Sequence, residues 1–172
     1  KRSGIEIYTE TCPHYLTLVE DELASRGALP KMSPPLRSNA DVEALWQAVQ
    51  ENLIDVIASD TAGHTRSANE PHRDQIFNAP YGIAGIDTLF KIAHSEGVNR
   101  GRITLTRLVQ LLSEQPARIF GLYPRKGAIV EGADADLVIL DPAASYTIPG
   151  QNPHLKVDYS MFEGRNGLGA PV

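Results

Sequence analysis

Asp60 is the acidic side chain best placed to do chemistry, because it follows directly on a short apolar stretch. Residues 55–58 are rich in β-branched side chains, and polar and turn-forming residues take over at Ser59 and Asp60. This pattern predicts a buried strand with a carboxylate at its carboxyl end. In parallel α/β architectures the ligand-binding loops converge at that end, so Asp60 is placed to bind a cation or a substrate. The alternative is that Asp60 simply begins a turn.

The histidines and the single cysteine do not predict a metal site of their own. No two histidines have the i, i+2 or i, i+4 spacing that places two ligands side by side; they are His14, His64, His72, His94 and His154. His94 falls in the last turn of an expected helix, where we expect it to face solvent. Cys12 and His14 are two residues apart, but side chains so placed in an extended loop are expected to point apart. No third group is evident that would orient a Cys-His nucleophile.

The composition is that of a folded, acidic protein. The chain has 172 residues, 42% of them hydrophobic, and a net charge of -5. It is long enough to bury a core, and no stretch is long and apolar enough to cross a membrane. The charge argues against a nucleic-acid surface, and one cysteine excludes an internal disulfide framework. We therefore expect a soluble, cytoplasmic protein that binds neither nucleic acid nor membrane.

The elements that would position Asp60 alternate between strand and helix. In chain order we expect a strand at 5–9, a loop at 10–18, a short helix at 19–26 ended by Gly27, an extended loop at 30–37, a helix capped by Ser38 or Asn39, and the strand at 55–58. The long helix carries Val42, Leu45, Trp46, Val49 and Leu53 at helical spacing, which predicts one buried stripe. A strand, a helix and a second strand in this order predict parallel neighbours.

After Asp60 the pattern is first helical and then alternating. We expect a loop without periodicity at 60–80 and a helix at 86–95 that Gly97 ends. Thr104 or Thr106 opens the next helix, which has Leu105, Leu108, Val109 and Leu112 on its inner face. A last helical turn is expected at 116–120. Strands are expected at 128–131 and 137–140, separated by a turn at 132–134. The change of period predicts a small β region from about residue 124.

Five motifs, in order, resemble the signatures of the cyclic amidohydrolases, the family of dihydroorotases, allantoinases, hydantoinases and dihydropyrimidinases. The segment Ser59–His64 resembles the family's Ser-Asp-His-Ala-Pro-His. The others are Glu10-Thr11-Cys12-Pro13-His14-Tyr15-Leu16, Ser33-Pro34-Pro35-Leu36-Arg37, residues 79–88, and Lys126-Gly127 through Asp136-Leu137-Val138-Ile139-Leu140-Asp141-Pro142. Together they extend over nearly the whole chain.

The resemblance implies an α/β fold: residues 1–123 as the C-terminal part of a metal-dependent hydrolase TIM (β/α)8 barrel, and residues 124–172 as an incomplete β-sandwich side domain. The family's metal ligands are a His-x-His pair, a carboxylated lysine, two further histidines and one aspartate. Of these only the aspartate has a counterpart here, Asp60. The others would lie in an N-terminal barrel half that is missing from this chain, so the one or two zinc ions of the complete enzyme are not expected on this chain alone.

The resemblance also assigns roles to particular residues. Asp60 is the expected catalytic residue and metal ligand. The expected substrate-binding residues are Ser33, His64, Pro80, Tyr81 and Gly82. Thr61 and Gly63 depart from the signature, which usually has His and often has Pro at these positions, so the orientation of the substrate can differ. For Arg37 we prefer a structural ion pair over a carboxylate clamp.

The function implied is hydrolysis of a cyclic amide or ureide by a complete metal-dependent enzyme of the hydantoinase, dihydropyrimidinase or allantoinase type. There a metal-bridging hydroxide attacks the ring carbonyl, and the aspartate matched by Asp60 transfers the proton to the leaving nitrogen. A dihydroorotase is the first alternative, and a non-catalytic dihydropyrimidinase-like assembly scaffold is the second. We expect this chain alone to be inactive, and the protein to form a dimer or tetramer.

Overall fold

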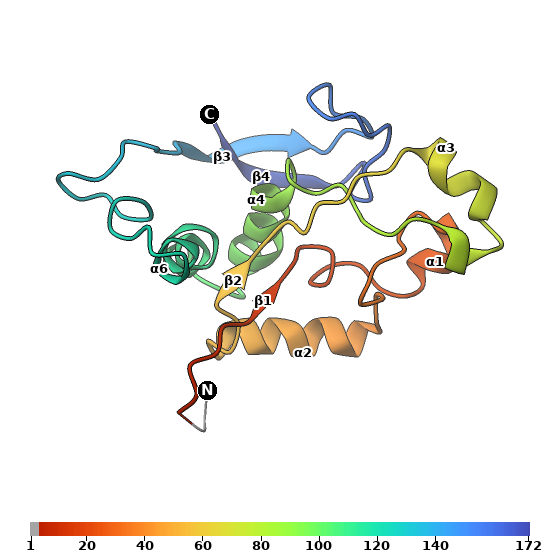
Figure 1. Ribbon diagram of the computed structural model, residues 1–172. Coiled ribbons are helices and arrows are strands. Elements are labelled where there is room, and N and C mark those ends of the chain that lie inside the picture. The colour runs from red at the N-terminus through yellow and green to blue at the C-terminus, as the bar shows by residue number, and fades with distance from the viewer. Residues whose placement is uncertain (1–3) are drawn as a thin grey trace.

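The computed structural model describes residues 4–172, and its centre is a pair of short parallel strands (Figure 1). Strand β1 (Glu10–Thr11) pairs with β2 (Val56–Ile57), with Glu10 opposite Val56 and Thr11 opposite Ile57. The long helix α2 (Asn39–Gln50) connects them and lies against one side of the pair. The predicted order of strand, helix and parallel strand is therefore confirmed, but the first strand lies at Glu10–Thr11 and not at 5–9.

Helix α2 forms where the local sequence predicts it. Ser38 and Asp41 make a capping box, in which the Ser38 hydroxyl accepts a hydrogen bond from the Asp41 amide and the Asp41 carboxylate accepts one from the Ser38 amide. The buried stripe is confirmed for Val42, Trp46 and Val49. Leu53 was wrongly placed on it, because the helix ends at Gln50 and Leu53 is exposed.

The expected strand at 5–9 is wrong, since the described residues 4–9 form no strand. The pairing lies further along the chain: the Asp55 amide donates to the Thr9 carbonyl and the Ala58 amide to the Thr11 carbonyl, each at 2.9 Å. Ile5, Ile7 and Tyr8 are exposed. The alternation at 5–9 therefore has no strand partner among residues 4–172.

Short helical elements surround this centre. They are α1 (Glu22–Arg26), α3 (Arg66–Asn69), η1 (Glu70–His72), η2 (Ile76–Asn78), α4 (Leu89–Ala93), η3 (His94–Asn99), α5 (Leu105–Val109), η4 (Gln110–Glu114) and α6 (Gln115–Ile119). Residues 60–80, expected to be structureless, thus contain three short helical turns. Helix α4 continues without a break into η3, and α5, η4 and α6 form one continuous helix.

Two details of these helices differ from expectation. Gly97 does not end its helix, which runs on to Asn99. Instead, a Cβ built on Gly97 would lie 3.0 Å from Ile103 and 3.3 Å from Trp46, so the glycine permits close packing. In the last long helix Leu108, Leu111 and Ala117 are buried, whereas Leu105 and Val109 are exposed. The inner face lies between Leu108 and Leu111, about a quarter turn from the one predicted.

The second sheet is an antiparallel pair, β3 (Leu140–Thr147) and β4 (Asn166–Pro171). The strand expected at 128–131 is absent, and the one expected at 137–140 begins only at Leu140. The preceding segment is a turn in which Lys126 forms ion pairs with Asp134 and Asp136. The pattern at 166–171, with two glycines and a proline, gave no strand signal.

Figure 1 shows α4 between the β1–β2 pair and the β3–β4 sheet. Tyr146 of β3 donates to the Lys91 carbonyl at 2.8 Å, and Asn99 donates to the Leu168 carbonyl at 2.8 Å. His94 is buried beneath Gly169, where a Cβ would lie 2.3 Å from the imidazole. The expectation that His94 faces solvent is therefore wrong, because β4 covers it.

The structure has two hydrophobic clusters. The first lies between α2, β2 and the helix at 105–119; it comprises Leu16, Val42, Trp46, Val49, Ile54, Ile57, Ala93, Ile103, Leu108 and Leu111. The second joins residues 18–36 and Ile83 and Ile92 to Ile148, Tyr159, Met161 and Phe162. The inner faces of α2 and of the helix at 105–119 are therefore buried within this chain.

Residues 4–172 do not close a barrel, because their sheets have two strands each. The α/β class is confirmed. Within this range no helix has the length and apolar character that a membrane span requires.

Candidate metal centre

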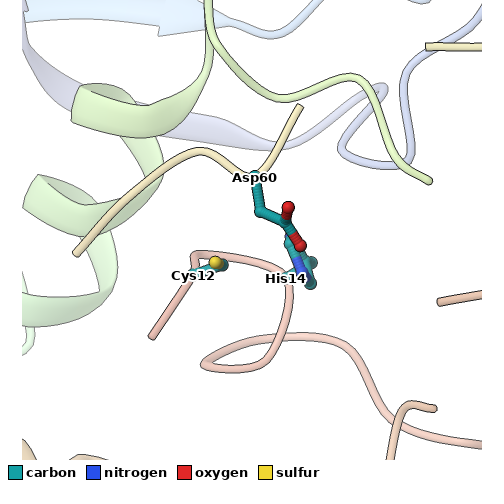
Figure 2. Close-up of side chains that lie close together, drawn as sticks. All are labelled: Cys12, His14 and Asp60. Carbon is teal, nitrogen blue, oxygen red and sulfur yellow. The ribbon is translucent and has the colours of Figure 1, made fainter. Parts of the chain in front are cut away.

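The parallel pairing of β1 and β2 brings two loops together at one edge of the sheet. Cys12 and His14 follow β1, and Asp60 follows β2. Figure 2 shows the Asp60 carboxylate directed toward the His14 ring, with Cys12 beside them. One ligand atom from each residue lies within 4.8 Å of the other two. The expectation that Cys12 and His14 point apart is wrong, since both side chains turn toward the end of β2.

The backbone at Asp60 directs its carboxylate toward the loop after β1. Its φ of +43° lies in the left-handed region, which non-glycine residues seldom adopt and which Asp and Asn tolerate best. Asp60 itself is exposed, whereas Cys12 and His14 are buried. The site therefore has a buried floor of sulfur and nitrogen and a carboxylate at its solvent side.

Burial keeps the two floor residues uncharged. It raises the pKa of the Cys12 thiol to about 12, and the nearby Asp60 and Glu10 carboxylates act in the same direction. Burial also lowers the pKa of His14 to about 4, against the attraction of Asp60. The Nε2 atom of His14 has no hydrogen-bond partner among the described residues. A buried, unpaired imidazole nitrogen is a strong donor for a cation.

A pocket of about 650 Å³ opens beside this group. Cys12, Tyr15 and Asp60 form one part of its wall. The remainder comes from Glu10, Thr11, Pro34, Pro35, Arg37, Asp41, Val42, Ala44, Leu45 and Ala48. A small molecule entering the pocket would therefore meet the Asp60 carboxylate. No ion pair of Arg37 is found within residues 4–172, so its structural role remains a prediction.

A family model described as the Amidohydrolase family matches residues 13–167. The chain belongs to this family. It is 39% identical to the D-hydantoinase of Geobacillus stearothermophilus, over the whole of this chain and 37% of that protein. It is 36% identical to the L-hydantoinase of Paenarthrobacter aurescens, over 98% of this chain and 37% of that protein. The chain thus spans little more than a third of the length of these relatives.

Solved structures of hydantoin-type enzymes resemble this amidohydrolase chain closely. A crystal structure of a D-hydantoinase matches with a TM-score of 0.94 and 38% identity, over 99% of this chain and 38% of that one. The dihydropyrimidinase from Brevibacillus agri NCHU1002 matches with a TM-score of 0.94 and 35% identity, over the same shares of the two chains. The amidohydrolase fold is therefore confirmed over the described residues.

The segments that carry the family resemblance lie together in this amidohydrolase chain. Thr61 bridges to Ile83 in parallel, and the Thr61 hydroxyl accepts a hydrogen bond from the Gly85 amide at 3.3 Å. The Gly82 amide donates to the Lys31 carbonyl at 3.0 Å, and the Lys31 ammonium lies 4.6 Å from the centre of the Tyr81 ring. The loops at 31–37, 60–64 and 79–85 thereby form one connected surface.

None of the expected substrate-binding residues lines the pocket. Ser33 and Tyr81 are exposed, and His64 and Pro80 are half-buried. Gly82 is buried with a φ of +131°, and a Cβ built there would lie 2.3 Å from the Cβ of Ala62. The close approach that Gly82 permits in this structure is thus to Ala62. The substrate roles of these five residues stay predictions.

The sequence singled out Asp60 as a candidate but not its neighbours. Cys12 and His14 lie within a recognised motif, and the signal that places them beside Asp60 is the parallel pairing itself. Cys12 and His14 lie one and three residues after the end of β1, and Asp60 lies three residues after the end of β2. Because these strands are parallel neighbours, the three residues lie close together.

Proposed function

We propose that this chain is the C-terminal part of a metal-dependent cyclic amidohydrolase that opens the ring of a hydantoin- or dihydropyrimidine-type ureide. The observation that carries the proposal is the carboxylate of Asp60, which lies beside an unpartnered imidazole nitrogen at the end of two parallel strands and faces a pocket. The relatives named D-hydantoinase, L-hydantoinase and dihydropyrimidinase support this choice of substrate.

The donor set fits a metal ion, because carboxylate, imidazole and thiol groups are the ligands that zinc takes in proteins. In this proposal Asp60 contributes one ligand to a centre of one or two zinc ions, and the other ligands come from an N-terminal barrel half outside this sequence. Zinc supplies Lewis-acid polarisation of the ring carbonyl and activation of water.

The residues of this chain bind the ring and move the proton. A carboxylate oxygen of Asp60 accepts a proton from the attacking water and passes it to the ring nitrogen as the carbon–nitrogen bond breaks. The Ser33 hydroxyl and nearby backbone groups hydrogen-bond to the planar CO–NH unit of the substrate. Tyr81 and Pro80 cover the ring, and His64 lies beside it.

The proposal extends to the context of the chain. Residues 1–123 complete a TIM barrel with the missing half, and residues 124–172 complete a β-sandwich side domain. We expect a homo-oligomer, a dimer or a tetramer, in the reducing environment of the cytoplasm, where a single buried thiol stays free.

Ring-opening assays of the full-length protein test the proposal. Hydantoin, dihydrouracil, allantoin and dihydroorotate are the substrates, with and without added zinc. We expect Asp60→Asn to lower turnover by about 10²- to 10⁴-fold, because proton transfer is lost while asparagine keeps the left-handed backbone. The control is Asp74→Asn, which removes an exposed carboxylate outside the pocket and should leave turnover unchanged.

The second candidate, a non-catalytic scaffold, rests on Thr61. This residue replaces the family's histidine, and its hydroxyl oxygen is engaged with the Gly85 amide. Metal-dependent opening of none of the four rings would favour the scaffold over the enzyme.

A further inference from the structure

A second pocket, of about 480 Å³, lies apart from the candidate metal centre. Its wall comes from the segments 25–29, 66–73 and 159–163. Figure 1 shows α1 and α3, which contribute to the first two segments, next to each other at the right-hand end of the view and away from the β1–β2 pair. The wall shares no residue with the pocket beside Asp60. Its volume suits a small organic molecule.

Arginine is the commonest charged residue in this wall. Three guanidinium groups and two carboxylates line the pocket, those of Arg26, Arg66, Arg73, Glu70 and Glu163. One positive charge is therefore in excess. Guanidinium groups bind carboxylate and phosphate oxygens through paired N–H donors, so the charged groups favour an anionic ligand.

Two of the three arginines are free to bind a new partner. Arg26 already pairs with Glu22, at 2.8 Å between Nε and Oε2. The Arg66 guanidinium lies 3.8 Å from the Glu163 carboxylate, which exceeds hydrogen-bond length. Arg73 is exposed, and its side chain has no ion pair or hydrogen bond within residues 4–172. A ligand oxygen can therefore reach Arg66 and Arg73 without breaking a hydrogen bond of either side chain.

Tyr159 provides an independent indication of a ligand at this place. It is 4% exposed, and its hydroxyl has no hydrogen-bond partner among residues 4–172. Buried polar atoms in folded proteins nearly always have a partner. Burial raises the pKa of Tyr159, so the hydroxyl keeps its proton and can donate. The centre of the Tyr159 ring lies 5.2 Å from the guanidinium carbon of Arg66, so one oxyanion group can contact both side chains.

We propose that Arg66, Arg73 and Tyr159 form a binding site for a small organic oxyanion, a phosphate ester or a dicarboxylate. The charged group of this ligand lies between the two guanidinium groups and accepts a hydrogen bond from the Tyr159 hydroxyl. The wall also contains Asn69 and Ser160, whose polar groups can hydrogen-bond to the rest of the ligand. The site is separate from the proposed ring-opening chemistry and does not depend on it.

Isothermal titration calorimetry of the full-length protein tests the site. The probes are inorganic phosphate and malonate, each titrated in about 0.15 M sodium chloride so that nonspecific attraction is screened. We expect saturable binding of at least one of them. Arg66→Gln, Arg73→Gln and Tyr159→Phe should each lower the affinity at least ~10-fold, because each removes a hydrogen bond to a charged group. Arg125→Gln is the matched control, since Arg125 is also exposed and lies 3.9 Å from its partner Asp134, outside the pocket.

The two probes and the variants decide the proposal. Tighter binding of phosphate supports a phosphate ester as the ligand, and tighter binding of malonate supports a dicarboxylate. Saturable binding of neither probe overturns the proposal. Equal affinity in Arg73→Gln and Arg125→Gln would also overturn it, because the anion would then bind elsewhere, for example at the metal centre. An unchanged affinity in Tyr159→Phe would do the same.

These variants are chosen to fold. Arg66 and Arg73 are exposed, and phenylalanine keeps the packing of the Tyr159 ring while it removes only the unpartnered hydroxyl. Circular dichroism monitors the fold of each variant. Ring-opening activity is assayed separately, so its absence would reject the proposed function without affecting the result for anion binding.

Discussion

At the scale of single residues, Trp46 is the largest buried side chain of the first hydrophobic cluster. Its ring is 1% exposed, and its indole nitrogen donates to the Leu16 carbonyl at 2.9 Å. Arg102 covers the ring from outside, with its guanidinium carbon 5.2 Å from the ring centre, while it forms an ion pair with Glu43. Trp46 thus connects α2 to the loop after β1.

We therefore expect Trp46→Ala to lower the free energy of unfolding by about 3–5 kcal/mol, because it leaves a cavity and an unpaired carbonyl. Urea denaturation measures the change. The exposed neighbour Gln47 is the control, and Gln47→Ala should have little effect. An unchanged midpoint in Trp46→Ala would contradict the assigned helix face.

A comparison of Gly82 with Gly101 separates two causes of destabilisation by an added side chain, backbone strain and steric overlap. Both have positive φ, but only Gly82 has an atom in the way, since nothing lies within 4 Å of a Cβ built on Gly101. We expect Gly101→Ala to cost about 1–2 kcal/mol from the left-handed backbone alone. Gly82→Ala should cost more, because its Cβ would overlap Ala62. Equal denaturation midpoints for the two variants would show that the Gly82 loop moves aside freely.

At the scale of elements, the capping box of α2 makes a measurable contribution. Ser38→Ala removes the side chain that accepts from the Asp41 amide, and we expect a loss of about 1 kcal/mol of stability. The control is Asn39→Ala, an exposed first-turn substitution outside the box. A loss no larger than that of the control would show that water replaces the cap.

The Asp41 side of the capping box predicts a pH dependence. The hydrogen bond from Ser38 lowers the pKa of Asp41 below its ordinary value. Its stabilisation is therefore present above the unfolded-state pKa and is lost as the pH falls through the lowered value. Denaturation of Asp41→Asn and the parent protein should differ at neutral pH and converge in acid. A constant difference would exclude the carboxylate as the cause.

The elements that sequence predicted well depend on local signals. Ser38, Thr104 and the stripe around Trp46 are readable within one or two turns of helix. Three of the errors depend on distant neighbours: Gly97 packs against Trp46, β4 covers His94, and the pairing of β1 with β2 turns Cys12 and His14 toward Asp60. A single sequence carries no direct record of such contacts, so Asp60 was identified and its two neighbours were not.

At the scale of the whole molecule, apolar side chains remain uncovered. Leu105, Val109 and Phe120 are exposed along the last long helix, and Ile5 and Ile7 are exposed before β1. Surfaces of this kind are uncommon on stable monomers when they form a contiguous patch. The parallel pair β1–β2 also has two strands only, and isolated pairs of this size are marginal in water.

We therefore expect the 172-residue chain on its own to self-associate. Size-exclusion chromatography with light scattering measures this directly. Leu105→Lys with Val109→Lys should reduce the association, whereas Leu122→Lys tests whether any exposed leucine has the same effect. A compact, cooperatively melting monomer from the unsubstituted chain would contradict the expectation.

The contacts that join the signature loops are made largely by main-chain atoms. The Gly82 amide binds the Lys31 carbonyl, and the Ala62 amide binds the Ile83 carbonyl. Side chains at 33, 64 and 81 can consequently be exchanged without removing these bonds. The frame of these loops therefore does not depend on the side chains at 33, 64 and 81, so in the enzyme that we propose these positions can change substrate preference while the frame persists.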